Sequence, residues 1–171
     1  MHANNGFTMK YTFYACPVGR ILLAGQGQTL HLISFANKDH KAQIKENWVR
    51  EDTTFQSAKA QLDAYFAGAL ESFDLPLYLN GSPFQNDVWQ ALCAIPFGET
   101  ITYGELAARV GRPRGAQAVG AANGANPLPI VIPCHRVIGA NNTLIGFGGG
   151  LETKRFLLEH EIKHTPHKRL I

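Results

Sequence analysis

The first part of the chain consists of short, largely hydrophobic runs separated by polar turn residues. The runs 9–15 (MKYTFYA), 20–25 (RILLAG) and 29–35 (TLHLISF) are rich in β-branched and aromatic residues. Between them lie Pro-Val-Gly and Gly-Gln-Gly-Gln, which suit tight turns. This pattern predicts a β-meander within a small sheet.

Helical spacing follows the meander. Residues 38–49 (KDHKAQIKENWV) are predicted to form one helix, and residues 54–68 (TFQSAKAQLDAYFAG) a second helix that Gly68 ends. The second helix has an apolar face made of Ala58, Leu62, Tyr65 and Phe66. Residues 73–79 (FDLPLYL) are predicted as a last strand, and NGSPF at 80–84 as a linker.

The second half of the chain is predicted to be helical and rich in loops. Residues 83–95 (PFQNDVWQALCAI) carry apolar side chains at helical spacing, namely Phe84, Val88, Leu92 and Ile95. Thr102 and Glu105 fit a capping box for the next helix, which Gly111 ends. Residues 114–124 (RGAQAVGAANG) are predicted as a further helix. Two short helices joined by Gly-Arg-Pro are typical of a helix-turn-helix.

The last of these helices is made almost wholly of small residues: Gly115, Ala116, Ala118, Gly120, Ala121 and Ala122. A glycine inside a helix costs about 1 kcal/mol relative to alanine, so this composition needs a compensating reason. One reason is close approach of the backbone to another surface, and another is tight packing against a neighbouring helix. Both can hold, on opposite faces of the helix.

The order of elements predicts an α+β fold. Residues 1–80 are expected to form a small N-terminal β-sheet domain with helices, and residues 81–171 a helical C-terminal domain containing the helix-turn-helix. No stretch is apolar enough to span a bilayer, and the N-terminus lacks the apolar run of a signal peptide. Three cysteines without C-x-x-C spacing argue against a disulfide framework. We therefore expect a soluble, cytoplasmic monomer.

Charge is distributed unevenly along the chain. Residues 1–80 carry seven basic and seven acidic side chains, whereas residues 81–171 carry nine basic and six acidic ones. No Asp or Glu occurs between Leu106 and Leu151, although this segment contains Arg109, Arg112, Arg114 and Arg136. An acid-free surface that bears arginines suits a polyanion such as DNA. Gly-rich loops with few charges of any kind are the other interpretation.

The candidate chemistry lies in residues 128–139 (LPIVIPCHRVIG). The apolar run before Pro133 is predicted as a buried strand, and Cys134 and His135 follow it directly. A thiolate is the nucleophilic form of cysteine, and a neighbouring imidazole can accept the thiol proton. A free cysteine is more often a small buried hydrophobe, which is the interpretation we give to Cys93 and Cys16.

Several motifs together resemble the O6-alkylguanine-DNA alkyltransferase family. The pentapeptide PCHRV at 133–137 is preceded by GANPLPIVI and followed by IGFGGGLETKRFLLEHE. The segment FQNDVWQALCAIPFGETITYGELA at 84–107 and the segment AVGAANGANP at 118–127 are also similar to that family in order and spacing. The likeness covers nearly all of residues 84–161 and is looser in the first 80 residues.

The resemblance implies a DNA-repair protein that acts once. Members bind duplex DNA, flip an alkylated guanine out of the stack and take its O6-alkyl group onto a cysteine, here Cys134. His135 would deprotonate the thiol through a water, Glu161 would orient the imidazole, and Tyr103 would donate its hydroxyl to the guanine. Arg136 is expected to be structural. No cofactor and no obligate protein partner is implied, and O4-alkylthymine remains open as a second substrate.

The resemblance also assigns binding residues. Asn126 would be a hinge between the DNA-binding helix and the active-site strand. Phe147 would line the guanine pocket, backbone groups near Val137 and Gly148 would read the guanine edge, and Lys154 would brace the loop. The expected DNA contacts are Thr102, Arg114, Gln117, Ala118, Ala121 and Asn123.

Two positions depart from the family pattern. Gln117 stands where an arginine of the recognition helix usually fills the gap left by the flipped nucleotide. Because glutamine carries no charge and stacks less well, we expect weaker DNA binding or a gentler extrusion step, unless Arg114 compensates. Phe147 replaces a tyrosine found in many relatives and removes a hydroxyl group from the pocket.

Metal sites and two other functions must be weighed. HEIKH at 160–164 fits the H-E-x-x-H zinc motif, but Pro166 follows closely and only His167 is left downstream as a third ligand. His31 matches a zinc ligand of some relatives without the partner cysteines, so we expect no metal. A cysteine hydrolase using Cys134 would turn over repeatedly. A non-catalytic lesion-binding protein of the same fold would lack the cysteine that is present here.

Overall fold

The computed structural model describes residues 8–165 and confirms the α+β fold. The chain divides into two compact units between Leu79 and Asn80. His167, considered above as a third ligand for the zinc motif, lies outside the described residues. Within residues 8–165, no helix combines the length and apolar character needed to cross a membrane.

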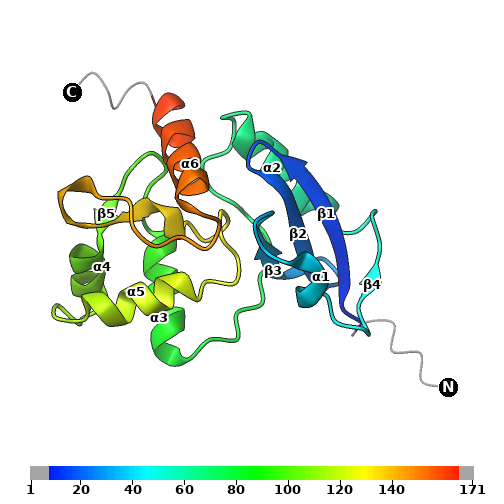
Figure 1. The fold of residues 1–171 in the computed structure, drawn as a ribbon, viewed down its shortest axis with the longest axis horizontal. Coiled ribbons are helices and arrows are strands. Elements are labelled where there is room, and N and C mark those ends of the chain that lie inside the picture. The colour runs from blue at the N-terminus through cyan, green and yellow to red at the C-terminus, as the bar shows by residue number, and fades with distance from the viewer. Residues whose placement is uncertain (1–7, 166–171) are drawn as a thin grey trace. The chain divides into compact units, whose positions relative to one another are not determined.

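The N-terminal unit is built on a four-stranded sheet (Figure 1). Strands β1 (Lys10–Cys16), β2 (Gly19–Gln26) and β3 (Thr29–Ser34) form the predicted antiparallel meander, and β4 (Val49–Arg50) pairs with β1 in parallel. The sheet order is β3-β2-β1-β4. The central strand β2 supplies much of this unit's core, because its residues 21–24 are wholly buried.

The two predicted helices of this unit differ in outcome. Helix α2 (Gln56–Phe66) is confirmed; Leu62 and Tyr65 are fully buried on its apolar face, and Gly68 follows it with φ +77°. The helix predicted over 38–49 is mostly wrong, since only α1 (His40–Gln43) forms. The rest turns back to place β4 beside β1, where the backbone N–H of Val49 donates to the carbonyl of Met9 at 2.9 Å. Sheet pairing therefore overrides a weak local helical pattern.

The strand predicted over 73–79 is reduced to one bridge between Leu30 and Leu77. The N–H of Leu30 donates to the Pro76 carbonyl at 3.0 Å, and the N–H of Tyr78 donates to the Leu30 carbonyl at 2.8 Å. Pro76 has no N–H to extend this ladder, so a regular strand does not develop.

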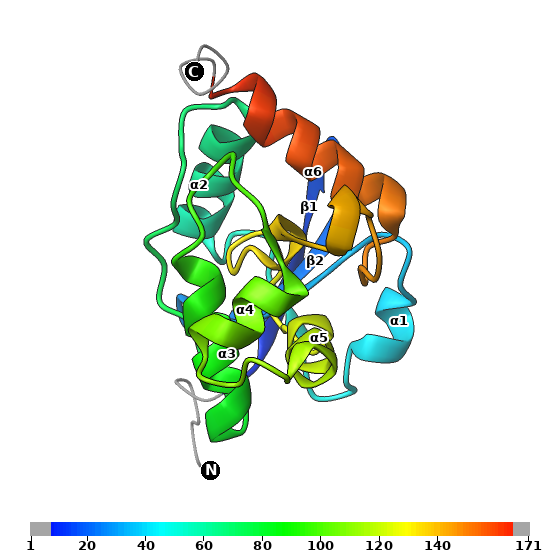
Figure 2. The same ribbon diagram turned by 90° about the vertical axis from the view of Figure 1, so that its left-hand side faces the viewer.

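The C-terminal unit contains four α-helices in the described residues: α3 (Pro83–Cys93), α4 (Tyr103–Arg109), α5 (Ala116–Gly124) and α6 (Leu151–Lys163). The first three lie together below α6 in Figure 2. Two short strands, β5 (Ile101–Thr102) and β6 (Val137–Ile138), pair in parallel. The 3₁₀ turns η1 (Cys134–Arg136) and η2 (Ala140–Asn142) complete the unit.

Capping chemistry fixes where these helices begin. The predicted box of Thr102 and Glu105 is present at the start of α4, with the Glu105 N–H donating to Thr102 Oγ1 at 3.1 Å. A second box, formed by Ser82 and Gln85, begins α3, with Pro83 in its first turn. The residues SPFQ carry this second signal in the sequence itself.

Small residues let α5 pack closely against its neighbours. Val119 and Ala122 are buried on its inner face, and the indole N–H of Trp89 on α3 donates to the Ala122 carbonyl at 2.9 Å. A Cβ on Gly120 would lie 3.7 Å from the ring of Tyr103. Helix–helix packing therefore accounts for one face of this glycine- and alanine-rich helix.

The buried strand predicted before Cys134 is wrong. Residues 128–132 form a tight buried turn, in which the Ile132 N–H donates to the Leu128 carbonyl at 2.8 Å. Ile130 has φ +73°, an uncommon value for a β-branched residue, so the apolar run cannot continue as a strand. Burial is predicted correctly, since Leu128 and residues 130–132 have at most 9% of their surface exposed.

Candidate active site

Cys134 and His135 lie in a short buried 3₁₀ turn that begins directly after Pro133. Cys134 is 5% exposed and His135 has no exposed surface. The turn is held from both sides, because the Cys134 N–H donates to the Ile132 carbonyl at 2.8 Å and the Arg136 N–H donates to the Pro133 carbonyl at 3.0 Å. The thiol of Cys134 and the imidazole of His135 are thus both held within the interior of the C-terminal unit.

Glu161 on α6 connects to this turn through two side chains. Its Oε2 contacts Nε2 of His135, and its Oε1 accepts a hydrogen bond from Nε of Arg136 at 2.7 Å. The backbone N–H of Gly98 also donates to Oε1, at 3.1 Å. With every carboxylate oxygen occupied, Glu161 has one defined orientation and fixes the ring of His135.

The hydrogen bonding of His135 leaves one ring nitrogen available. Nε2 faces Glu161, so we assign the proton to Nε2 and the lone pair to Nδ1. Nδ1 is buried and has no hydrogen-bond partner among residues 8–165. A neutral imidazole with a free, buried lone pair is the form that can accept a proton.

The electrostatics of the turn favour a neutral pair in the resting protein. Burial raises the pKa of the Cys134 thiol to about 11, although Asn126 and Lys154 act to lower it. Burial lowers the pKa of His135, and Glu161 partly opposes this. Although burial acts to raise the pKa of Glu161, His135 and Arg136 lower it to about 2, so this carboxylate stays charged. The thiol therefore needs a base before it can react at neutral pH.

Arg136 has the structural position expected of it. Its Nη1 donates to the Ile95 carbonyl at 2.7 Å while its Nε holds Glu161, and the side chain is buried. It thereby joins the end of α3 to α6 and places a positive charge beside the carboxylate. No property of the PCHRV motif alone identifies these two acceptors.

Two asparagines hold the backbone around Cys134. Nδ2 of Asn126 donates to the Ile132 carbonyl at 2.8 Å, and its Oδ1 accepts from the Leu128 N–H at 2.9 Å. Asn123 is 4% exposed, and its Nδ2 donates to the Cys134 carbonyl at 3.4 Å. The side chain of Asn123 thus points into the protein, which does not favour its predicted contact with DNA.

The loop before α6 is tied to Tyr103 and Lys154 through one atom. The Tyr103 hydroxyl donates to the Ile145 carbonyl at 3.2 Å, and Lys154 Nζ donates to the same carbonyl at 3.0 Å. Lys154 is fully buried, and its Nζ lies 5.9 Å from the centre of the Tyr103 ring. Burial raises the pKa of Tyr103 and lowers that of Lys154.

The remaining residues predicted to line the guanine pocket lie before this loop and within it. Val137 is fully buried in β6, directly after the 3₁₀ turn. Phe147 is half-buried and Gly148 is exposed, within the glycine-rich stretch that ends at Gly150, the N-cap of α6.

The outer face of α5 carries the other predicted DNA contacts. Gln117, Ala118 and Ala121 are exposed on this helix, and Arg114 is exposed just before it. Thr102 is half-buried, and its hydroxyl serves as the cap of α4. The structure thus brings four of the six predicted residues onto one exposed segment of the chain.

The other two cysteines do not behave alike. Cys93 is exposed, so the expectation that it is a buried hydrophobe is wrong. The buried face of α3 is formed by Val88, Trp89 and Leu92, and Cys93 lies one position beyond it. Cys16 is half-buried, and its thiol contacts the Gly19 carbonyl at 3.1 Å.

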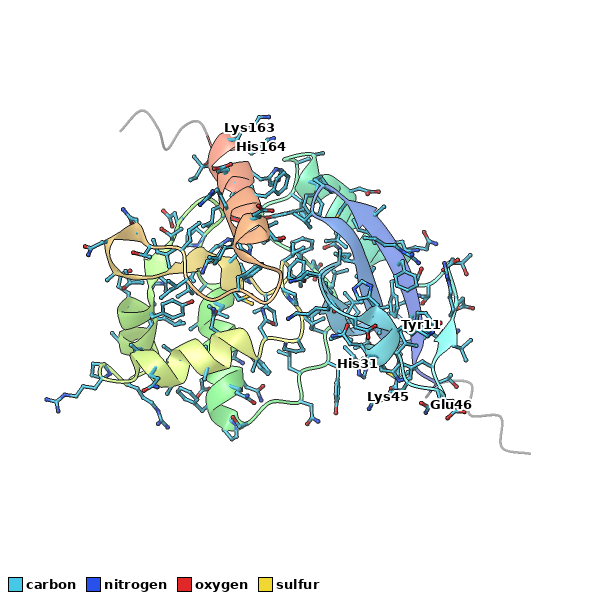
Figure 3. All side chains as sticks on the ribbon, in the orientation of Figure 1. Tyr11, His31, Lys45, Glu46, Lys163 and His164 are labelled. Carbon is cyan, nitrogen blue, oxygen red and sulfur yellow. The ribbon has the colours of Figure 1, made fainter. Side chains whose placement is uncertain are left out.

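The residues of the H-E-x-x-H match serve the fold and the Cys134 site. Glu161 holds His135 and Arg136, while Nδ1 of His164 contacts the His160 carbonyl at 2.8 Å at the end of α6 (Figure 3). Among residues 8–165, no cluster of three or more His, Cys, Asp or Glu side chains could hold a metal ion. His31 instead stacks on Tyr78, with ring centres 4.4 Å apart.

Comparison with known proteins decides the family. The DNA-binding domain of 6-O-methylguanine DNA methyltransferase matches residues 83–163, and the ribonuclease-like domain of the same proteins matches residues 9–79. The chain belongs to the 6-O-methylguanine DNA methyltransferase family. The resemblance drawn from the PCHRV region is thereby confirmed.

Individual members of this family align over most of the chain. A methylated-DNA–protein-cysteine methyltransferase of Methanosarcina acetivorans is 48% identical over 153 residues, which cover 90% of this chain and 98% of the relative. The same-named protein of Mycolicibacterium paratuberculosis is 46% identical, over 92% of this chain and 95% of the relative.

Solved structures of the family have a similar fold. The crystal structure of Mycobacterium tuberculosis OGT in complex with DNA has a TM-score of 0.85 and 45% identity, over 91% of this chain and 94% of that one. The O6-methylguanine-DNA methyltransferase of Pyrococcus kodakaraensis has a TM-score of 0.65 and 26% identity, over 90% and 99% of the two chains.

Proposed function

We propose that this protein repairs duplex DNA by moving the alkyl group of an O6-alkylguanine onto Cys134. The observation that carries the proposal is the buried Cys134–His135–Glu161 constellation in a chain of the 6-O-methylguanine DNA methyltransferase family. A buried nucleophile next to an oriented base suits a transfer from which bulk water is excluded.

The reaction begins with removal of the thiol proton. Nδ1 of His135 accepts it through a bridging water, and Glu161 stabilises the imidazolium that forms. The Cys134 thiolate then attacks the alkyl carbon, so that an S–C bond forms as the C–O6 bond breaks. The electron pair of the broken bond goes to the guanine, which must gain one proton to become the normal base.

Tyr103 meets the charge that develops on the guanine. Its hydroxyl lies at the loop that borders the site, where it can donate to the leaving base. The resulting thioether has no good leaving group, so Cys134 does not regenerate. One protein molecule therefore repairs one base.

Docking on DNA is assigned to the exposed face of α5. Gln117, Ala118 and Ala121 carry short or uncharged side chains that allow the helix backbone to approach the duplex, and Arg114 supplies a phosphate contact. Because Cys134 is 5% exposed, the lesion must leave the helical stack to reach it. We place this activity in the cytoplasm, on chromosomal DNA, and O4-alkylthymine is a candidate second substrate.

Intact-protein mass spectrometry tests the proposal. Incubation with a duplex containing O6-methylguanine is expected to add one methyl group, about 14 Da, to the wild-type chain and to leave Cys134→Ser unchanged, since only a thiolate is nucleophilic enough. Cys93→Ser is the matched control, because it removes an exposed thiol, and it is expected to behave like the wild type. Repeated turnover would indicate a hydrolase, and an unmodified wild-type chain would overturn the proposal.

A further inference from the structure

The N-terminal unit carries a hollow of about 490 Å³ beside α1 that the alkyl-transfer site does not use. Its walls include the aromatic side chains of Tyr11, Phe13 and Trp48 and the basic side chains of Arg20, Lys41 and Lys45. Tyr11 and Lys45 lie at the same end of the sheet in Figure 3. The volume is in the range of pockets that bind small organic molecules.

The aromatic walls are only partly covered by protein. Tyr11, Phe13 and Trp48 are each half-buried, and the rings of Tyr11 and Phe13 meet edge to face at 5.9 Å. The guanidinium of Arg20 lies 3.7 Å from the centre of the Phe13 ring. Because Arg20 covers the Phe13 ring, the half-exposed rings of Tyr11 and Trp48 are the flat faces on which a planar ligand can stack.

The basic side chains of the hollow lack carboxylate partners. Elsewhere in this unit Lys10 pairs with Glu51 at 2.8 Å and Arg50 with Asp52 at 3.0 Å. Among residues 8–165, Arg20, Lys41 and Lys45 form no such ion pair, and Glu46 is the one acidic residue among the lining side chains. The hollow therefore has a positive excess that attracts an anion.

We propose that this hollow binds an unpaired nucleotide within a single-stranded segment of DNA. Planar faces for a base together with unpaired cations for phosphates are the combination that single-strand binding sites use. Arg20 belongs to β2, whereas Lys41 belongs to α1 and Lys45 follows that helix, so the cations reach the hollow from two separate parts of the chain. The inference goes beyond the proposed repair reaction, because it involves neither Cys134 nor α5.

Fluorescence of Trp48 provides a direct test of stacking. The chain has two tryptophans, and Trp89 is 3% exposed, so quenching by an oligothymidylate is expected to come from Trp48. Trp48→Phe is expected to lose the quenching while keeping the affinity. Trp48→Ala is expected to weaken binding at least about five-fold, the lower limit for loss of one base–aromatic stack.

Charge is tested with a matched pair of double variants and a labelled oligothymidylate in fluorescence anisotropy. Lys41→Gln with Lys45→Gln is expected to weaken binding at least about five-fold and to reduce the salt slope by roughly 1.4, since each phosphate contact on a single strand contributes about 0.7. Lys38→Gln with Lys163→Gln removes the same charge from exposed positions outside the hollow and is expected to change affinity less than about two-fold.

Two further measurements, alkyl transfer by each variant and competition by free thymidine monophosphate, complete the test. Together with the matched double variants, they separate binding in this hollow from general attraction to a basic protein and from capture of a free nucleotide. Alkyl transfer from duplex DNA is measured on every variant and is expected to stay at the wild-type rate, which separates failure here from failure of the proposed repair function. Equal weakening by both double variants, or unchanged quenching in Trp48→Phe, would overturn the proposal. Competition by free thymidine monophosphate at the same nucleotide concentration as the strand would also overturn it, in favour of a free-nucleotide site.

Discussion

Glu161 is the residue whose protonation most directly links the active site to folding. His135 and Arg136 lower its pKa to about 2 against the opposing effect of burial, whereas an unfolded chain has a glutamate pKa near about 4.3. A depressed folded-state pKa stabilises the protein above the unfolded value, and this contribution is lost as pH falls through the folded value. The contact network of Glu161 should therefore weaken in acid.

Stability of the wild type is expected to decrease as the pH is lowered from about 4.5 to 2, by an amount of the order of 3 kcal/mol. Glu161→Gln is expected to remove this part of the pH dependence. Glu159→Gln, an exposed carboxylate on the same helix, is the control and should keep the wild-type profile. Urea unfolding across this pH range measures the effect, and parallel profiles for wild type and Glu161→Gln would contradict the argument.

Gln117 is the residue that we expect to stand in place of an arginine usual in the family. It is exposed on α5, so an arginine there can reach DNA without disturbing the core. Gln117→Arg is expected to tighten duplex binding about five-fold and to steepen the salt slope by about 0.9, because one more phosphate is neutralised.

The control for Gln117→Arg is Gln90→Arg, which adds the same charge at an exposed position on α3. Duplex affinity and single-turnover alkyl-transfer rate are measured for both. A Gln117→Arg protein with no gain in either quantity would show that glutamine does not limit DNA binding or base extrusion.

The helices of the C-terminal unit depend on their caps. Thr102 and Ser82 each complete a capping box, and Tyr103 is the first residue of α4. Loss of either cap is expected to destabilise the protein by about 1 kcal/mol. The two caps differ, however, in their distance along the chain from Tyr103, which we propose donates to the leaving guanine.

Thr102→Ala and Ser82→Ala are therefore expected to lower the free energy of unfolding by similar amounts, about 1 kcal/mol each, in urea titrations. Thr102→Ala alone is expected to slow alkyl transfer as well, because it loosens the segment that positions Tyr103. Equal transfer rates in the two variants would mean that the cap of α4 has no part in placing this side chain.

At the scale of elements, the sequence predicts whatever depends on local pattern. The β-rich runs of β1–β3, the apolar spacing in α2 and α3, and the Thr102 box are properties of neighbouring residues, and all are confirmed. The helix predicted over 38–49 is mostly wrong and the strand predicted for residues 130–132 is wrong, because strand pairing in one case and a left-handed Ile130 in the other are set by tertiary structure. The prediction that this apolar run is buried is nevertheless confirmed, because burial does not depend on whether the backbone forms a strand or a turn.

At the scale of the whole molecule, the site is assembled from segments that are distant in sequence. His135 and Glu161 are 26 residues apart, and Arg136 reaches back 41 residues to Ile95. Periodicity cannot predict these contacts, and only likeness to a known family pairs Cys134 and His135 with Glu161. The hollow beside α1 has no signal in the sequence, because its walls come from β1, β2 and a segment in which the predicted helix is too long.

The Ile145 carbonyl, which accepts hydrogen bonds from both Tyr103 and Lys154, sets an order of steps when a base enters the site. Tyr103 has one hydroxyl hydrogen, and it is already directed at the Ile145 carbonyl. Serving an incoming purine requires that this bond be given up first. Lys154 keeps the carbonyl satisfied during the exchange, since its ammonium carries three hydrogens and stays bonded to the same oxygen. If Tyr103 donates to the base as proposed, recognition of the base therefore requires the Tyr103 hydroxyl to change partners, while Lys154 keeps the loop in place.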